Sequence, residues 1–146
     1  MSRSIEFRET MRGSYHLNRA PGQERPIALH VRARTAPLSR FLFDPVAEID
    51  GEIDAPGLAS HRPMRGSLEI DPLRRRRIGY DVRFEDDEGR PCRLYGAKEL
   101  ELMRLHSTLT TLPASLWRED EPIGRALLRF DLRADLGALL RSIRVR

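Results

Sequence analysis

The sequence has a single cysteine, Cys92, so no disulfide can form within the chain. It also has no apolar run near the roughly 18 residues needed to cross a bilayer, so no transmembrane segment is predicted. No apolar stretch follows the first residues, and a secretory signal is therefore not expected. Together these absences favour the cytoplasm as the location of the protein.

Motifs typical of enzymes and metal sites are missing as well. The chain has no glycine-rich phosphate loop, no G-x-S-x-G and no H-E-x-x-H sequence. Its histidines lack metal-ligand spacing, and Cys92 is expected to be an inert core thiol. The four histidines are His16, His30, His61 and His106. We therefore predict a protein that is not an enzyme and that holds no metal and no cofactor.

Lysine is almost absent, because all but one of the 26 basic residues are arginine. Against 22 acidic residues this gives a net charge of +4, and charges of both signs alternate along the sequence. The one dense basic run is Arg74, Arg75, Arg76 and Arg77, expected in a solvated loop. An acidic partner protein, an anionic membrane surface or nucleic acid is the functional alternative for this run. No aromatic residues suited to base stacking are interleaved with it, so nucleic acid is not a predicted partner.

Apolar and polar residues alternate over most of the chain, which is typical of half-buried β-strands. The clearest case is a hairpin from Ile78 to Leu102 about the polar turn 85–90. Eight strands are predicted in all, at residues 5–17, 27–34, 49–55, 64–70, 78–85, 92–102, 106–117 and 124–132.

Short turns join these strands, and no helix of crossover length lies between them, so the sequence predicts an all-β antiparallel meander. Residues 1–146 are expected to form one domain. Closure into a lipocalin-like barrel would remove the exposed sheet edges, and a two-layer sandwich is the alternative. We also expect a short helical turn within 37–45 and a C-terminal helix from Asp135. The apolar stripe of that helix would be Leu136, Leu139, Leu140 and Ile143.

Five glycines fall on the apolar side of the predicted strands, where each of them packs nothing and weakens the strand. They are Gly13, Gly51, Gly66, Gly96 and Gly124. One explanation is steric, since glycine lets a strand coil sharply or makes room for a neighbouring ring. The other is that the missing side chains leave a cavity inside the barrel. The two explanations are compatible, and we take the five glycines as candidate ligand-binding positions.

Glu9 and Lys98 are polar exceptions on the same apolar side. A buried charge is unfavourable unless it is paired, so the two side chains are expected to meet each other or to lie near a barrel mouth. A salt bridge between them would fix the register of the strands. Alternatively, both would point into a cavity and orient the polar end of a ligand.

Several short motifs resemble a family of bacterial accessory domains. They are Phe7-x-Glu9-Thr10-Met11-x-Gly13, Gly51-x-Ile53-x-Ala55-Pro56-Gly57-Leu58, Tyr80-x-Val82-x-Phe84 with Gly89, Leu94-x-Gly96-x-Lys98, the run 107–112 and the ending 124–145. Domains of this family occur attached to, or encoded near, flavin-dependent oxidoreductases of the GMC (glucose-methanol-choline) type that look like cholesterol oxidases. The resemblance implies an association with sterol or lipid metabolism. The chain has no flavin-binding region, so oxidase activity is not implied.

Two functions follow as expectations. The first is a non-catalytic module that binds an apolar small molecule, a sterol or lipid, as an accessory to a sterol or lipid oxidoreductase. The second is a structural or interaction domain with a packed core, which docks to a GMC-type oxidoreductase or forms a homodimer. A continuous cavity of a few hundred Å³ would favour the first, and a filled core would favour the second.

Overall fold

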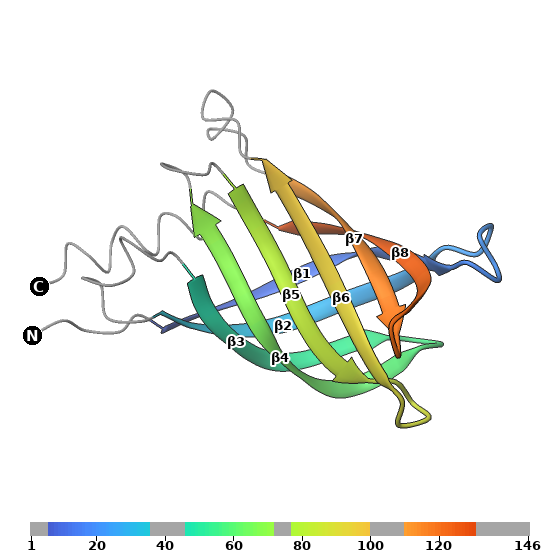
Figure 1. The fold of residues 1–146 in the computed structure, drawn as a ribbon. Coiled ribbons are helices and arrows are strands. Elements are labelled where there is room, and N and C mark those ends of the chain that lie inside the picture. The colour runs from blue at the N-terminus through green and yellow to red at the C-terminus, as the bar shows by residue number, and fades with distance from the viewer. Residues whose placement is uncertain (1–5, 36–45, 72–76, 100–109, 131–146) are drawn as a thin grey trace, which may run out of the picture.

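The computed structural model describes residues 6–35, 46–71, 77–99 and 110–130, which form a closed antiparallel β-barrel (Figure 1). Each strand pairs with the next strand along the chain, and β1 pairs with β8 to close the ring. The strands are β1 (Glu6–Leu17), β2 (Arg25–Thr35), β3 (Val46–Ala55), β4 (Ala59–Asp71), β5 (Arg77–Glu85), β6 (Pro91–Glu99), β7 (Thr110–Arg118) and β8 (Glu121–Phe130).

The predicted all-β meander is confirmed, and the ring is a barrel and not a two-layer sandwich. Four connections gather at one end of it, between β1 and β2, β3 and β4, β5 and β6, and β7 and β8 (Figure 1). We call this the hairpin end. The predicted helical turn within 37–45 and the predicted C-terminal helix lie outside the described residues.

The core is the inside of the barrel, which receives every second side chain of each strand. The predicted apolar parity is confirmed on the seven strands to which a parity was assigned, because their buried apolar side chains are those of the inner side. On β7, where the alternation in the sequence is less regular, the buried residues are Leu112, Ala114 and Leu116. Among the most deeply buried are Met11, Tyr15, Ile27, Leu29, Ile53, Leu68, Ile78, Tyr80, Leu94, Leu112, Leu116 and Leu128.

Six of the strands begin earlier than predicted, β4 by the largest margin. β4 starts at Ala59 and not at Met64. In the part of the strand that was not predicted, His61 has a positive φ of 49° and the register of the β3–β4 pair shifts nearby. This irregularity interrupts the alternation that the sequence prediction relied on. Arg77, expected in a solvated loop, is the first residue of β5, where its Nε lies 3.0 Å from Glu69 Oε1.

The turn between β7 and β8 is also tighter than expected. Glu119 and Asp120 both have positive φ, at 48° and 69°, and Arg118 pairs directly with Glu121. Two consecutive residues with positive φ are the geometry of a type I′ hairpin turn, which usually contains asparagine or glycine. The pair Glu-Asp does not signal this turn, so the sequence placed a longer polar turn here.

Candidate binding site

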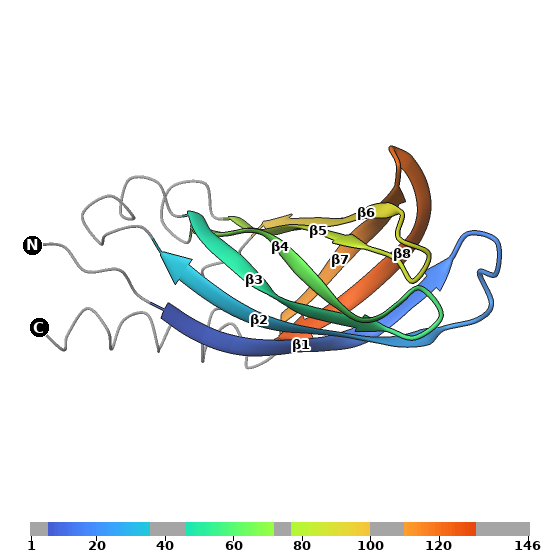
Figure 2. The same ribbon diagram turned by 90° about the horizontal axis from the view of Figure 1, so that it is seen from below.

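Glu9 lies on the inner face of β1, as its parity predicts. Its carboxylate Oε1 accepts a hydrogen bond from the hydroxyl of Tyr80 on β5. β1 and β5 are four strands apart in the ring of eight, and Figure 2 shows them on opposite sides of the barrel. Two side chains that meet across this distance must both point inward. Glu9 is half-buried and Tyr80 is only 1% exposed, so this contact is an internal polar bridge.

Lys98 has the inward parity of β6 but lies near the end of the barrel away from the hairpin turns. It is opposite the buried Ile78 in the strand register, yet its own side chain is exposed. Its Nζ donates a hydrogen bond to the backbone carbonyl of Thr111, at 3.2 Å. Among the described residues Glu9 and Lys98 form no ion pair with each other. Each of the two charges therefore has a separate partner, and the salt bridge considered from the sequence is not formed.

The five inner-face glycines share one steric environment. A Cβ atom at any of them would lie closer than 3.0 Å to a backbone carbonyl oxygen of a neighbouring strand. At Gly66 that oxygen belongs to Asp81 of β5, and at Gly51, whose φ is 150°, it belongs to His30 of β2. The same holds for Gly13, Gly96 and Gly124. The structure thus supports the steric explanation, in which glycine lets neighbouring backbones approach where the strands coil. A ligand-binding role for these glycines stays a prediction.

The interior of the described barrel is packed with side chains. Met11, Leu29, Leu94 and Leu112 have no exposed surface, and Tyr80 has 1%. A cavity that could hold a lipid would leave surface accessible on the side chains around it. The packing near these residues is therefore that of a filled core, and a filled core favours an interaction domain over a lipid-binding module.

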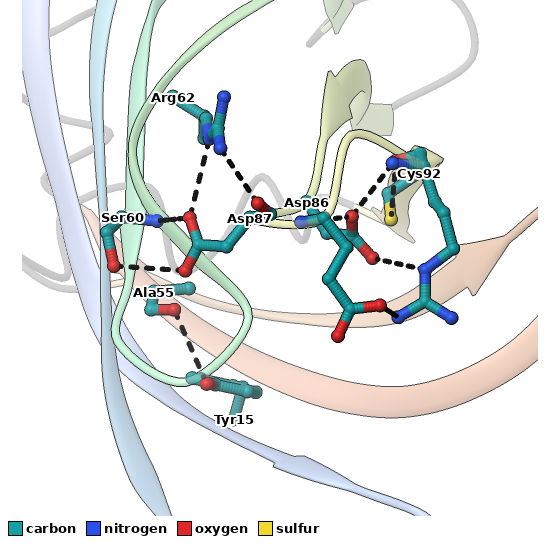
Figure 3. Close-up of polar contacts among 9 residues, drawn as sticks. Tyr15, Ala55, Ser60, Arg62, Asp86, Asp87 and Cys92 are labelled. Atoms are coloured by element: carbon teal, nitrogen blue, oxygen red, sulfur yellow. Dashed lines mark hydrogen bonds and ion pairs between the residues drawn. The ribbon is translucent and has the colours of Figure 1, made fainter.

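A buried carboxylate organises the hairpin end. The side chain of Asp86 is 2% exposed, and its Oδ1 accepts hydrogen bonds from the backbone N–H of Glu88, at 3.0 Å, and of Arg90, at 2.8 Å (Figure 3). Its Oδ2 lies 3.1 Å from Arg90 Nε and 3.0 Å from Arg118 Nε. Burial acts to raise the pKa of Asp86, but the two N–H donors and the two guanidinium charges outweigh it, so the pKa is lowered.

The adjacent turn residue Asp87 links two hairpins. Its Oδ1 accepts a hydrogen bond from the backbone N–H of Ser60, at 2.8 Å, and Arg62 Nε lies 3.4 Å from the same oxygen (Figure 3). Tyr15 of β1 donates its hydroxyl proton to the carbonyl of Pro56 in the β3–β4 turn. The sequence placed a polar turn at 85–90 but gave no role to its acids. An aspartate three residues before a glycine, as Asp86 is before Gly89, is the available signal for a turn of this kind.

Cys92 and the histidines, which were examined in the sequence for catalytic or metal-binding roles, have contacts of a structural kind where they are described. Cys92 is buried, and this burial is the main cause that raises the pKa of its thiol. His16 lies 3.1 Å from Glu24 and His30 lies 3.2 Å from Thr10, both on the outer face as predicted. His106 and Arg74 to Arg76 lie outside the described residues. Within the described ranges no three histidine, cysteine or acidic side chains gather where they could hold a metal ion.

The described residues line a concavity on the outer face of β2 to β5 that reaches the start of β6. It is a groove of about 1240 Å³ with arginine and acidic side chains along it. The arginines are Arg32, Arg34, Arg62, Arg65 and Arg83, and the acids are Glu48, Asp50 and Glu85. The sequence showed these charges as an alternating pattern, but it could not show that the strands align them beside one another.

No protein-family model matches this chain, and neither a curated protein nor a solved structure does. The resemblance to accessory domains of GMC-type oxidoreductases is therefore still a prediction. Among the described residues, no helix has the length and apolar character that a membrane crossing requires.

Proposed function

We propose that this chain is a non-catalytic interaction domain, a packed barrel that docks to a partner protein through its outer surface. The filled interior carries this proposal, because inner side chains such as Met11 and Leu94 have no exposed surface. The closed ring supports it further. With β1 paired to β8, every described strand has a neighbour on both sides, which leaves little open edge for a partner strand to add to. Recognition by the described part of the chain therefore falls to side chains on the outer face and at the ends.

The partner to test first is a GMC-type oxidoreductase encoded near this chain. The motifs that resemble the accessory domains support this choice, Glu9 and Lys98 among them. Docking would place the domain beside an enzyme of sterol or lipid metabolism without giving it any catalytic step. A second copy of this chain is the other candidate partner.

A second candidate function is the binding of an apolar small molecule, a sterol or lipid, inside the barrel. The bridge between Glu9 and Tyr80 is the observation that favours it, because it places a half-buried carboxylate on the inner wall. Lys98 carries an exposed ammonium group toward the same end of the barrel. Such groups are suited to orient the polar end of an amphiphilic ligand.

Native mass spectrometry of the purified chain, followed by lipid extraction, separates the two functions. For an interaction domain with a filled core we expect the mass of the chain alone and no stoichiometric lipid. A sterol or fatty acid bound at one molecule per chain would overturn the proposal in favour of the second candidate. Size-exclusion chromatography with the purified oxidoreductase should then show co-elution, whereas a mass twice that of the chain would identify a homodimer.

A further inference from the structure

The groove on the outer face contains two arginines that face each other. Arg65 of β4 and Arg83 of β5 are direct partners in the strand register, and both side chains are exposed. Residues directly opposite on antiparallel strands have Cβ atoms about 4.5–5.5 Å apart, and like charges at this spacing repel. Neither arginine makes a hydrogen bond or an ion pair with another described residue. The charge of Arg83 still favours the nearby carboxylate of Asp81, but no hydrogen bond to a described residue holds either guanidinium group in place.

Neighbouring arginines on the same surface do have partners. Arg32 holds Asp50 through two hydrogen bonds of 3.0 and 3.1 Å, and Arg93 holds Asp81 through two of 2.8 Å. Asp50 also faces Arg65 across the β3–β4 pair, but its two oxygens are already engaged by Arg32. Arg65 and Arg83 are thus left as two guanidinium groups with free donors, side by side in a concave surface.

The groove itself follows from how the barrel coils. Gly51 and Gly66 line it, although both belong to the inner parity, and both are partly exposed. A Cβ at either position would collide with the carbonyl oxygen of the next strand, and as glycine each residue is partly exposed to solvent. At about 1240 Å³ the groove exceeds the roughly 300–1,000 Å³ typical of small-molecule sites. Its size suits a segment of a macromolecule.

We propose that this groove binds an acidic peptide segment of the partner protein, with its carboxylates on Arg65 and Arg83. This inference rests on the proposed interaction function and names its surface. A guanidinium group binds a carboxylate through two parallel hydrogen bonds, so two adjacent arginines suit two acidic side chains of one segment.

The charges along the groove favour a peptide over other polyanions. Glu48 and Glu85 also line it, and they would repel a nucleic-acid backbone, which is negative along its whole length. A peptide can place acids at the arginines and neutral residues at the glutamates. A bilayer surface is flat on this scale, whereas the two arginines lie in a hollow.

The barrel supplies a matched control for this pair. Arg12 of β1 and Arg129 of β8 are also direct register partners, and both are exposed, but neither lines the groove. Replacing either pair by glutamine removes the same charge from the same kind of cross-strand position. Only the surroundings of the two pairs differ.

The test uses fluorescence anisotropy of a fluorescein-labelled peptide with repeating Glu-Gly units, and the Gln-Gly peptide as its neutral counterpart. We expect the unmodified chain to bind the acidic peptide only. The Arg65→Gln/Arg83→Gln variant should lose about tenfold or more in affinity, as expected when charged hydrogen bonds are removed. The Arg12→Gln/Arg129→Gln variant should stay within about twofold, because any difference reflects only long-range charge.

Three results would overturn the inference: no binding of the acidic peptide, equal loss in both variants, or a labelled oligonucleotide or phosphatidylserine vesicle that binds in its place and depends on Arg65 and Arg83. A separate experiment, size-exclusion chromatography of both variants with the oxidoreductase, tells failure of the groove apart from failure of the proposed function. If the groove variant still co-elutes like the unmodified chain, the interaction function stands and the groove is the wrong surface. If the chain never co-elutes and carries lipid, the proposed function fails.

Discussion

The hairpin end and the outer groove both bring arginines together, but they do so in opposite ways. At the hairpin end, Arg90 and Arg118 converge on the buried carboxylate of Asp86. In the groove, Arg65 and Arg83 face each other with no acid between them. The first arrangement satisfies a charge that folding has removed from water, which is a structural task. The second leaves charge available in water, which is what a binding surface requires. Exposure and partners, and not residue type, separate the two tasks.

Removal of the Asp86 carboxylate should have the largest effect on stability. In Asp86→Ala, two backbone N–H groups lose their acceptor, and the guanidinium groups of Arg90 and Arg118 lose the buried charge between them. We expect a loss of about 3–5 kcal/mol in the free energy of unfolding, because each lost hydrogen bond to the charged carboxylate contributes about 1.5–3 kcal/mol. Urea denaturation measures it. Glu88→Ala is the control, since Glu88 pairs with Arg90 in the same turn but is 72% exposed and should change stability little. Equal losses in the two variants would show that the buried carboxylate of Asp86 stabilises the fold no more than the exposed one of Glu88.

The next largest effect is expected at Gly66. A Cβ in Gly66→Ala would overlap the carbonyl oxygen of Asp81, so the two strands must separate. We expect a loss of about 3 kcal/mol, the upper part of the range for overpacking. Gly79→Ala is the matched control, because a Cβ at this strand glycine would meet its nearest neighbour at an ordinary 3.5 Å. Thermal melts of both variants check the prediction, and a Gly66→Ala protein as stable as Gly79→Ala would contradict the steric explanation of the inner-face glycines.

The contribution of Asp86 should also depend on pH. Its pKa is lowered in the folded protein from an unfolded value of about 4. A lowered pKa means that the stabilisation is complete above the unfolded pKa and is lost as the pH falls through the folded pKa. The stability gap between the unmodified chain and Asp86→Asn should therefore be constant from neutral pH down to about 5 and should narrow below about 4. Urea denaturation across this range measures the gap. A gap that widens toward low pH would reverse the sign and refute the assignment.

Lys98→Met should have a small effect. A buried pair with Glu9 would have made this change costly, but Lys98 is exposed and donates to the carbonyl of Thr111. We expect a change within about 0.5 kcal/mol, as for most surface substitutions. A loss of several kcal/mol in a thermal or urea melt would show that Lys98 compensates a buried charge after all.

The smallest effect on folding is expected for the groove pair. Arg65→Gln/Arg83→Gln removes two like charges that face each other, so the free energy of unfolding should stay the same or rise by a few tenths of a kcal/mol. Arg93→Gln tests the same substitution at an arginine that holds Asp81 and should lower stability slightly instead. If the double variant were clearly less stable than the unmodified chain, the two arginines would be structural and the comparison would fail.

Much of the barrel could be predicted because alternation is a local property of the chain. The parity of Met11, Tyr80 and Leu94 is visible in the residues next to them, and so is the inward position of Glu9. The early start of β4 could not be predicted, because His61 and the register shift break the alternation just where the strand begins. Local patterns fail where the backbone is irregular.

The polar clusters could be predicted only in part, because they depend on how strands pair. Asp86 was assigned to a turn, but its partner Arg118 comes from the end of β7 and is brought close only by the barrel. Arg65 and Arg83 face each other because of the β4–β5 register, which alternation alone does not specify. The bridge from Glu9 to Tyr80 likewise requires that the ring be closed.

The pairing of β1 with β8 also determines the order in which the barrel can assemble. Each of the other strand pairs joins neighbours along the chain, so these hairpins can form as the chain leaves the ribosome. The last seam joins the most distant strands, and such non-local contacts are slow to form. Until β8 arrives, β1 exposes an unpaired edge, and open edges recruit other chains. A fragment that ends before Glu121 should therefore aggregate. Pairing of β8 with β1 covers the open edge and so protects the barrel from misassembly.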